Sequence, residues 1–329
     1  MPASREGWIR KADWVALSHA EIAALLRPAL GQVAIVAAAR VSGGLVNTNL
    51  QVTLNKPSGR VLLRVFQRDP LQARKEAAID RLIDGRAPSA RFLYFSPSNP
   101  ITGSPYAVLQ WVDGIQLDHA TRNADESTRW RLGAAVGEVL ARIHSFRFPR
   151  FGFFTDDLEV PTAIDLDRDG LLWFMRRCLI EGPGGQRLGA VLTERLFTFV
   201  EREGSRLDAW LGEPTLTHAD FNPSNILVHR DENGWRVAAV LDWEFALSAT
   251  PAFDVGNLLR LPFGNWPEFV AGFERGYRAA GGELPGDWRL IAQIADIFAW
   301  VDLLGQRSKD AALAADAQRV IAATVEIGG

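Results

Sequence analysis

Residues 216–227 read LTHADFNPSNIL, and residues 240–244 read VLDWE. The first run contains Asp220 and, five positions later, Asn225, while the second contains Asp242. Taken singly, Asp220 could cap a turn and Asn225 could form an Asx-turn. The three together are more specific, because an Asp, an Asn and a second Asp are the residue types that position a hydroxyl and bind Mg²⁺ when a phosphoryl group leaves ATP.

The residues between the two runs indicate how they come together. The apolar segments within residues 226–241 predict two short strands, joined by the turn sequence DENG. Pro223 disfavours a regular helix in the preceding loop. The returning strand would bring Asp242 back beside Asn225, so that two oxygen ligands converge on one hard cation.

Composition excludes several classes of protein. The net charge of −3 gives no pull toward nucleic acid or anionic membrane, so we expect neither as a partner. The single cysteine rules out a disulfide framework or a thiolate zinc cluster within one chain and fits a reducing compartment. No signal-peptide core or membrane-length apolar run is found, which predicts a cytoplasmic protein, and no obligate protein partner is indicated.

The first third of the chain has the pattern of a small antiparallel sheet. Residues 18–30 predict a helix with Ser18 as N-cap, and residues 70–83 predict a second helix. The segments between and after them are short and apolar, separated by turn residues. The predicted strands are residues 33–39, 50–54, 61–66, 91–95 and 106–112.

Helical periodicity dominates the rest of the chain, apart from the hairpin of residues 226–241. The helical segments are residues 126–146, 169–180, 188–211, 265–279 and 287–305. We therefore predict an α+β fold with two lobes: a small β-rich N-terminal lobe, residues 1–112, and a larger, mainly helical C-terminal lobe, residues 113–329.

Three motifs carry a resemblance to a known family. Residues 218–225 match H-x-D-x-x-x-x-N, residues 242–244 match D-x-E, and residues 251–254 match P-x-x-D. In these motifs and in lobe order the chain resembles the aminoglycoside phosphotransferase / choline kinase family, which phosphorylates small molecules on a protein kinase-like fold. The resemblance extends over nearly the whole chain, and its catalytic-loop motifs are the most specific part.

The resemblance implies a role for each motif residue. Asp220 would accept or orient the proton of the substrate hydroxyl, and Asn225 with Asp242 would hold Mg²⁺. Asp254 would brace the catalytic loop from an early helix position, with His218 as further structural support. For Asp254 the alternative is an ordinary early-helix carboxylate favoured by the helix dipole.

Two further charged residues suggest a phosphate site in the first lobe. Arg64 lies inside an apolar strand, where a charged side chain is rare unless it is paired with an opposite charge. Glu76, in the following helix, is the expected partner. An arginine fork can contact the α- and β-phosphates, with the carboxylate holding it in place. The alternative is an edge-strand arginine that faces solvent.

The remaining nucleotide contacts are predicted from position in the lobe. Residues 42–49 (SGGLVNTN) suit a loop over phosphates, although an ordinary hairpin turn fits as well. No G-x-x-x-x-G-K-[ST] motif occurs. Residues 106–114 resemble the family's lobe connector, where backbone pairs with the adenine edge. The residues expected to contact nucleotide are Ser42, Gly43, Gly44, Asn47, Gln110 and Val112.

The acceptor is expected to be a small molecule rather than a protein. Ala219 stands where protein kinases carry the Arg of H-R-D, and only 11 residues separate Asp242 from Asp254, too few for a long activation segment. Asp296 and Trp300, four apart on one helix, could attract a cationic acceptor near Asp220. The alternative places Trp300 in the core and makes Asp296 a solvated or capping residue.

Three hypotheses remain open at this point. The first is an ATP- and Mg²⁺-dependent O-kinase of a small-molecule hydroxyl, with GTP as a possible donor in place of ATP. The second, within the enzyme class, is a choline-, ethanolamine- or homoserine-type kinase. The third is a kinase-like binding protein without catalysis. Glu244 could support the site, contact substrate or simply be solvated, and the sequence does not identify the acceptor.

Overall fold

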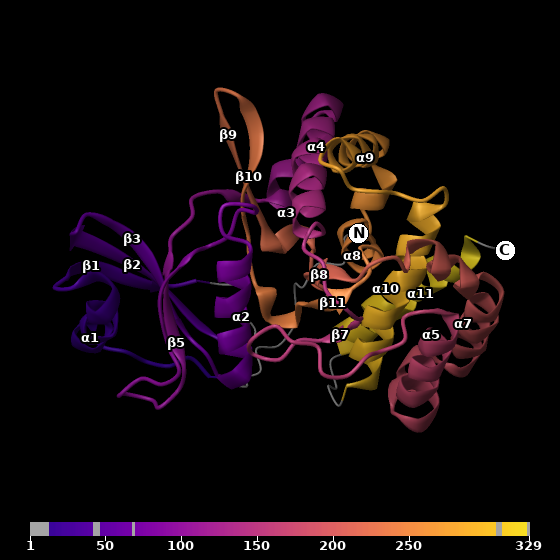
Figure 1. The fold of residues 1–329 in the computed structure, drawn as a ribbon, viewed down its shortest axis with the longest axis horizontal. Helices are drawn as coiled ribbons and strands as arrows, with labels where there is room; N and C mark the ends of the chain where they lie inside the picture. The colour runs from indigo at the N-terminus through magenta and orange to yellow at the C-terminus, as the bar shows by residue number, and fades with distance from the viewer. Residues whose placement is uncertain (1–12, 42–46, 68–69, 307–310, 328–329) are drawn as a thin grey trace.

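The structure, a computed structural model, describes residues 13–41, 47–67, 70–306 and 311–327. Its N-terminal part contains a five-stranded antiparallel sheet in the order β1-β2-β3-β5-β4, and helix α2 lies between this sheet and the rest of the molecule (Figure 1). The elements are α1 His19–Leu30, β1 Ala34–Arg40, β2 Thr48–Lys56, β3 Gly59–Val65, α2 Pro70–Leu82, β4 Phe92–Ser96 and β5 Tyr106–Gln110.

Local sequence signals account for this part. Ser18 and Glu21 form a reciprocal capping box at the start of α1, with the Ser18 N–H donating to the Glu21 carboxylate at 2.7 Å. Strand β2 alternates buried and half-buried residues. Its buried side chains, including Val52, meet Leu26 of α1 in one apolar cluster. The predicted helix of residues 18–30 and the predicted antiparallel sheet are therefore confirmed.

The C-terminal part is mainly helical and has its own, larger apolar core. The helices are α3 Leu117–Arg122, α4 Glu126–Ile143, α5 Arg168–Met175, α6 Gly184–Leu188, α7 Ala190–Glu203, α8 Ala252–Leu258, α9 Pro267–Ala279, α10 Trp288–Gly305 and α11 Ala311–Glu326, with a π-helical segment at Arg176–Glu181. Within the described residues, no helix is both long enough and apolar enough to cross a bilayer.

Two small antiparallel sheets stand among these helices, in the orders β10-β9-β6 and β7-β11-β8. Their strands are β6 Ile115–Gln116, β7 Gly152–Phe153, β8 Thr215–Thr217, β9 Ile226–Asp231, β10 Gly234–Val240 and β11 Leu247–Ala249. The β9–β10 hairpin was predicted. The other four strands were not, because a strand of two or three residues has no readable period.

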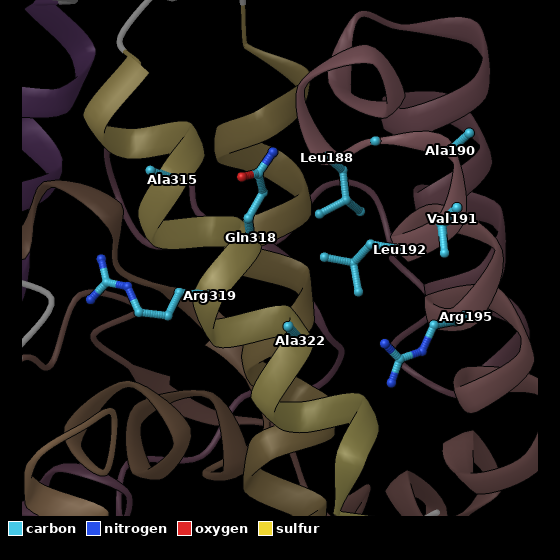
Figure 2. A pocket seen from close by; sticks show the side chains of 10 residues that line it. Leu188, Ala190, Val191, Leu192, Arg195, Ala315, Gln318, Arg319 and Ala322 are labelled. Carbon is cyan, nitrogen blue, oxygen red and sulfur yellow. The ribbon is translucent and has the colours of Figure 1, made fainter.

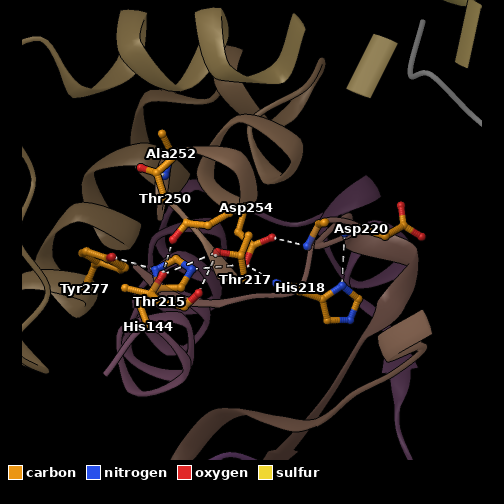
Figure 3. Close-up of polar contacts among 11 residues, drawn as sticks. His144, Thr215, Thr217, His218, Asp220, Thr250, Ala252, Asp254 and Tyr277 are labelled. Carbon is orange, nitrogen blue, oxygen red and sulfur yellow. Dashed lines mark hydrogen bonds and ion pairs between the residues drawn. The ribbon is translucent and has the colours of Figure 1, made fainter. Parts of the chain in front are cut away.

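Helices α4 and α9 pack unusually close together. A Cβ on Gly272 of α9 would lie 2.0 Å from the Trp130 carbonyl oxygen of α4, and one on Gly137 of α4 would lie 2.3 Å from the Phe273 carbonyl oxygen of α9. Glycine is thus required on both faces. The close packing fixes α4, which ends at its C-cap His144, and α9, which carries Tyr277; both side chains are buried and lie near each other (Figure 3).

Candidate active site

Two strand ladders hold the two polar runs side by side. In one ladder Ile226 of β9 pairs with Val240 of β10, and in the other Thr217 of β8 pairs with Leu247 of β11. The loop of residues 218–225 and the turn of residues 241–246 therefore both run between the same two ladders. The Leu241 N–H donates to the Asn225 carbonyl oxygen at 2.8 Å, which brings Asp242 next to Asn225.

The loop itself orients the Asp220 carboxylate. The Asn225 amide nitrogen donates to the Asp220 carbonyl oxygen and to its Oδ2, both at 2.9 Å. The Asn222 amide nitrogen donates to Asp220 Oδ1 at 2.8 Å. Sequence reasoning missed Asn222, although its position before Pro223 in an Asx-type turn is a signal that could have found it. Both carboxylate oxygens are thereby fixed before any substrate binds.

A buried network of hydrogen bonds holds the backbone of the loop (Figure 3). The Asp254 carboxylate is fully buried and accepts from the His218 N–H and the Ala219 N–H, each at 2.8 Å. His144 Nε2 lies 3.1 Å from Asp254 Oδ2, and the Tyr277 hydroxyl lies 2.8 Å from His144 Nδ1. Burial and the nearby Asp254 carboxylate raise the pKa of Tyr277, which keeps its hydroxyl a donor.

His218 ties the loop to the neighbouring turn. The Asp220 N–H donates to His218 Nδ1 at 3.2 Å, so the proton belongs on Nε2, which then donates to the Leu241 carbonyl oxygen at 2.9 Å. Ala219 and Asp242 adopt left-handed backbone conformations, with φ of 60° and 66°. Such conformations cost about 1–2 kcal/mol in a non-glycine residue, and these hydrogen bonds hold the chain in them.

Asn225 and Asp242 carry oxygen atoms of the kind that bind a magnesium ion. Because the Asn225 amide nitrogen faces Asp220, its amide oxygen points away from that carboxylate. The Asp242 side chain does not cap the 3-10 turn that follows it. Among the described residues, no group of three or more His, Cys, Asp and Glu could hold a metal ion. Two protein oxygens with phosphates completing the shell are the usual arrangement for Mg²⁺ in kinases.

On the N-terminal side, Arg64 and Glu76 form a buried ion pair. The guanidinium donates to Glu76 Oε2 at 2.8 Å, and Arg64 Nε donates to Asn49 at 3.0 Å. The other Glu76 oxygen, Oε1, is buried without a hydrogen bond. Burial, opposed by the charge of Arg64 and reinforced by the carboxylates of Asp242 and Glu244, raises the pKa of Glu76 to about 7. The ion pair therefore lies within electrostatic range of the Asp242 turn.

Helix α2 also contacts that turn directly. Lys75 Nζ donates to the carbonyl oxygens of Glu244 at 2.8 Å and Ala246 at 3.1 Å. The Gln72 amide donates to the Glu244 carbonyl oxygen at 3.0 Å and approaches its carboxylate at 3.3 Å. Glu244 is thus held from α2. Nothing in the sequence signalled these contacts, which join residues 169 or more positions apart.

The other predicted nucleotide residues are less informative. Ser42, Gly43 and Gly44 lie outside the described residues. Asn47 is buried, and its side-chain oxygen accepts from the Gln67 N–H at 3.2 Å. Gln110 ends β5, and its N–H already donates to the Arg91 carbonyl at 2.8 Å, so a base edge would have to meet another atom of Gln110. Val112 follows two positions later and is half-buried.

Asp296 and Trp300 meet, but in the core. The Trp300 indole N–H donates to Asp296 Oδ2 at 2.8 Å, and Arg260 forms a two-pronged ion pair with the same carboxylate at 2.8 and 2.7 Å. The Arg260 guanidinium lies 4.3 Å from the Trp300 ring centroid. Both residues are buried. Trp300 therefore lies in the core, as the alternative expected, but Asp296 is neither solvated nor a cap: its carboxylate is buried and paired with Arg260, so it is not offered to a cationic acceptor.

A pocket of about 610 Å³ lies between the α6–α7 connection and α11 (Figure 2). Its walls are mainly apolar, and none of the residues discussed above lines it. Its two arginines are paired, Arg195 with Glu326 at 4.0 Å and Arg319 with Asp316. We assign it no part in the candidate site.

Sequence comparison identifies a family. The model of the phosphotransferase enzyme family matches residues 37–292. Among curated proteins, acyl-CoA dehydrogenase family member 11 of Mus musculus is 25% identical over 234 residues, which cover 68% of this chain and 27% of that protein. The chain thus spans about a quarter of the length of the curated relatives that it matches.

Solved structures of similar fold are phosphotransferases. The GDP complex of wild-type aminoglycoside 2'-phosphotransferase-IIIa has a TM-score of 0.71 at 15% identity, covering 95% of this chain and 100% of that one. An ethanolamine kinase of Plasmodium vivax has a TM-score of 0.60 at 14% identity, covering 88% and 81%. These matches confirm the protein kinase-like fold, with an antiparallel sheet in the N-terminal part and helices in the C-terminal part.

Proposed function

The chain belongs to the phosphotransferase enzyme family, and on that premise we propose that it is an ATP- and Mg²⁺-dependent kinase of a small-molecule hydroxyl. The observation that carries the proposal is the Asp220 carboxylate, held by Asn222 and Asn225 at 2.8 and 2.9 Å on a loop that Asp254 braces. A carboxylate fixed in this way beside a two-oxygen metal site is the minimum needed to align a hydroxyl with a phosphoryl group.

In the proposed reaction the acceptor hydroxyl oxygen bonds to the γ-phosphorus while the bond to the bridging β–γ oxygen breaks, releasing ADP. The hydroxyl proton passes to Asp220, whose orientation is set before binding. Asn225 and Asp242 would hold Mg²⁺, which when bound neutralises phosphate charge. Most of the rate acceleration would come from positioning the two reactants and neutralising phosphate charge, because the proposed reaction is a direct transfer without a covalent enzyme intermediate.

We assign the nucleotide to residues 1–112 and the acceptor to residues 113–329. Arg64, held by Glu76 at 2.8 Å, would contact the α- and β-phosphates, and the connector around Gln110 and Val112 would meet the base. The donor is ATP in this proposal. GTP is the alternative, since one protein of similar fold was solved with GDP.

Two other functions are weighed against this one. A choline-, ethanolamine- or homoserine-type kinase would use the same loop, and the likeness to an ethanolamine kinase gives it some support. A catalytically inactive binding protein would have no need of a fixed Asp220 carboxylate. The intact set of Asp220, Asn225 and Asp242, with Arg64 paired to Glu76, therefore favours catalysis.

The direct test compares Asp220→Asn with the wild-type protein. ADP release is measured across aminoglycosides, amino alcohols and other hydroxyl compounds, and nucleotide binding is measured by calorimetry with ATP and Mg²⁺. We expect the variant to bind nucleotide and to lose at least about 10²-fold of turnover, since the base is removed. Asp208→Asn, at an exposed position after α7 and away from the residues discussed, is the matched control. Wild-type turnover in Asp220→Asn would refute the proposal.

A further inference from the structure

We propose that the body of the acceptor is apolar and packs on three phenylalanine rings, called here the aromatic wall: Phe253, Phe298 and Phe174. The inference rests on the proposed kinase function and names its substrate class. Acceptors with an alkyl or aryl body would be preferred over polyamine sugars. The wall stands on three helices that are far apart in sequence, α8, α10 and α5, and adjoins the loop that carries Asp220.

The three rings form one continuous surface. The Phe253 and Phe298 centroids are 5.3 Å apart, and the Phe298 and Phe174 centroids are 5.8 Å apart. Each ring is only half-buried, so each keeps part of its surface outside the core. Aromatic and other apolar side chains are the usual lining of small-molecule sites, with a few polar groups that fix orientation.

The wall begins at the catalytic loop. Ala219, the residue before Asp220, packs into the same small apolar cluster as Phe253 and Phe298, around Leu247. Phe253 immediately precedes Asp254, whose carboxylate accepts from the Ala219 N–H at 2.8 Å. An alanine at position 219 keeps this end of the wall free of charge, where an arginine would introduce one. A hydroxyl at Asp220 would therefore lie close to the wall.

Charge on the surrounding helices agrees with an apolar acceptor. Asp296 lies two positions before Phe298 on α10, but it is buried against Arg260 and is not offered to an acceptor. Asp302, four positions after Phe298, is exposed and accepts from the Gln306 amide at 2.8 Å. Asp165 is in a loop whose neighbours join the same apolar cluster, and it is exposed. A solvated carboxylate attracts a cation only weakly, so this position does not make the wall a polyamine site.

The experiment measures kcat/KM by ADP release for a series of straight-chain alkyl alcohols and for kanamycin, with ATP and Mg²⁺ and the full chain. Burying one more methylene on the wall is expected to raise kcat/KM about fourfold, until the chain outgrows the rings. Phe298→Ala should flatten this dependence, and Phe298→Leu, which keeps an apolar side chain and the fold, should flatten it partly. Phe197→Ala, half-buried on α7, is the matched control.

A second readout separates this inference from the proposed function. Binding of the same alcohols to Asp220→Asn in the presence of ADP is measured by calorimetry, without turnover. Two results would overturn the aromatic wall and leave the kinase function standing. One is turnover of kanamycin together with a kcat/KM for the alcohols that does not depend on alkyl length, and the other is a length dependence that survives in Phe298→Ala. Length-dependent binding without any phosphorylation by the wild-type protein would overturn the kinase function and leave the wall.

Discussion

Replacing Asp254 by asparagine tests how the catalytic loop is held. The carboxylate is fully buried and accepts two backbone N–H groups at 2.8 Å, from His218 and Ala219. An asparagine would turn an NH₂ group toward one of these donors, leaving at least one buried N–H unsatisfied and removing a charge from the other bond. The free energy of unfolding should fall by roughly 4 kcal/mol, because each hydrogen bond to a charged group contributes about 1.5–3 kcal/mol.

Relaxation of the loop offsets part of that loss. With φ at 60°, Ala219 would gain about 1 kcal/mol by leaving the left-handed region. The net destabilisation is then roughly 3 kcal/mol, and the loop that relaxes carries Asp220 with it. A shift of about 1 Å in a catalytic group lowers turnover about 10²-fold. We expect both effects in Asp254→Asn, with nucleotide affinity nearly unchanged.

The assay combines urea unfolding, followed by tryptophan fluorescence, with kcat from ADP release. Asp80→Asn is the control, because Asp80 is a buried carboxylate that also accepts a backbone N–H, from Phe92 at 3.0 Å, but lies in the N-terminal part. It should lose stability and keep kcat. An Asp254→Asn protein with wild-type kcat would refute the bracing role, even if its stability fell like that of the control.

Three further perturbations follow from the packing and the charges. Because the Glu76 carboxyl titrates near 4.5 when unfolded and at about 7 when folded, its stabilising contribution is lost as pH rises through 7. The wild-type protein should therefore lose about 1.4 kcal/mol relative to Glu76→Gln between pH 6 and pH 8 in urea unfolding, and parallel pH profiles would contradict this. Arg260→Ala should lower stability by about 3–5 kcal/mol, because it leaves the Asp296 carboxylate buried without its ion-pair partner. In thermal unfolding, adding Asp296→Ala to this variant should restore much of the lost stability, and additive losses of stability from the two substitutions would contradict the prediction. Gly272→Ala should destabilise the protein by about 1–3 kcal/mol, because its Cβ would clash with the α4 backbone. Gly286→Ala, with open space around it, should unfold like the wild-type protein in calorimetry. Equal effects of the two substitutions would count against the close packing of α4 and α9.

The elements predicted from the sequence are those with a long, regular pattern. Helices α1 and α4 and the β9–β10 hairpin were anticipated from caps, periodicity and turn residues. Helix α11 was not predicted, although Leu313, Ala317, Ile321 and Val325 recur at helical spacing and are buried. Strand β8 was not, because three residues carry no period, although it leads directly into the catalytic loop.

Within the candidate site, the parts set by local spacing could be predicted from the sequence, whereas the long-range contacts could not. The interval between Asp220 and Asn225 indicated a loop, and the structure closes it with hydrogen bonds at 2.9 Å. The bond between His144 and Asp254 joins residues 110 positions apart, which no local pattern can encode. Helical spacing brought Asp296 and Trp300 together correctly, but it could not reveal that Arg260, which follows α8 in sequence, would pair with the Asp296 carboxylate.

The most direct test of the central claim is the identity of the reaction product. The wild-type protein is incubated with ATP, Mg²⁺ and a mixed panel of hydroxyl compounds, and mass spectrometry follows both nucleotide and acceptors. The account predicts one or more acceptors heavier by a single phosphoryl group, in amounts equal to the ADP formed, and neither product with Asp220→Asn. Nucleotide binding without any phosphorylated acceptor, or equal phosphorylation by the variant, would contradict it.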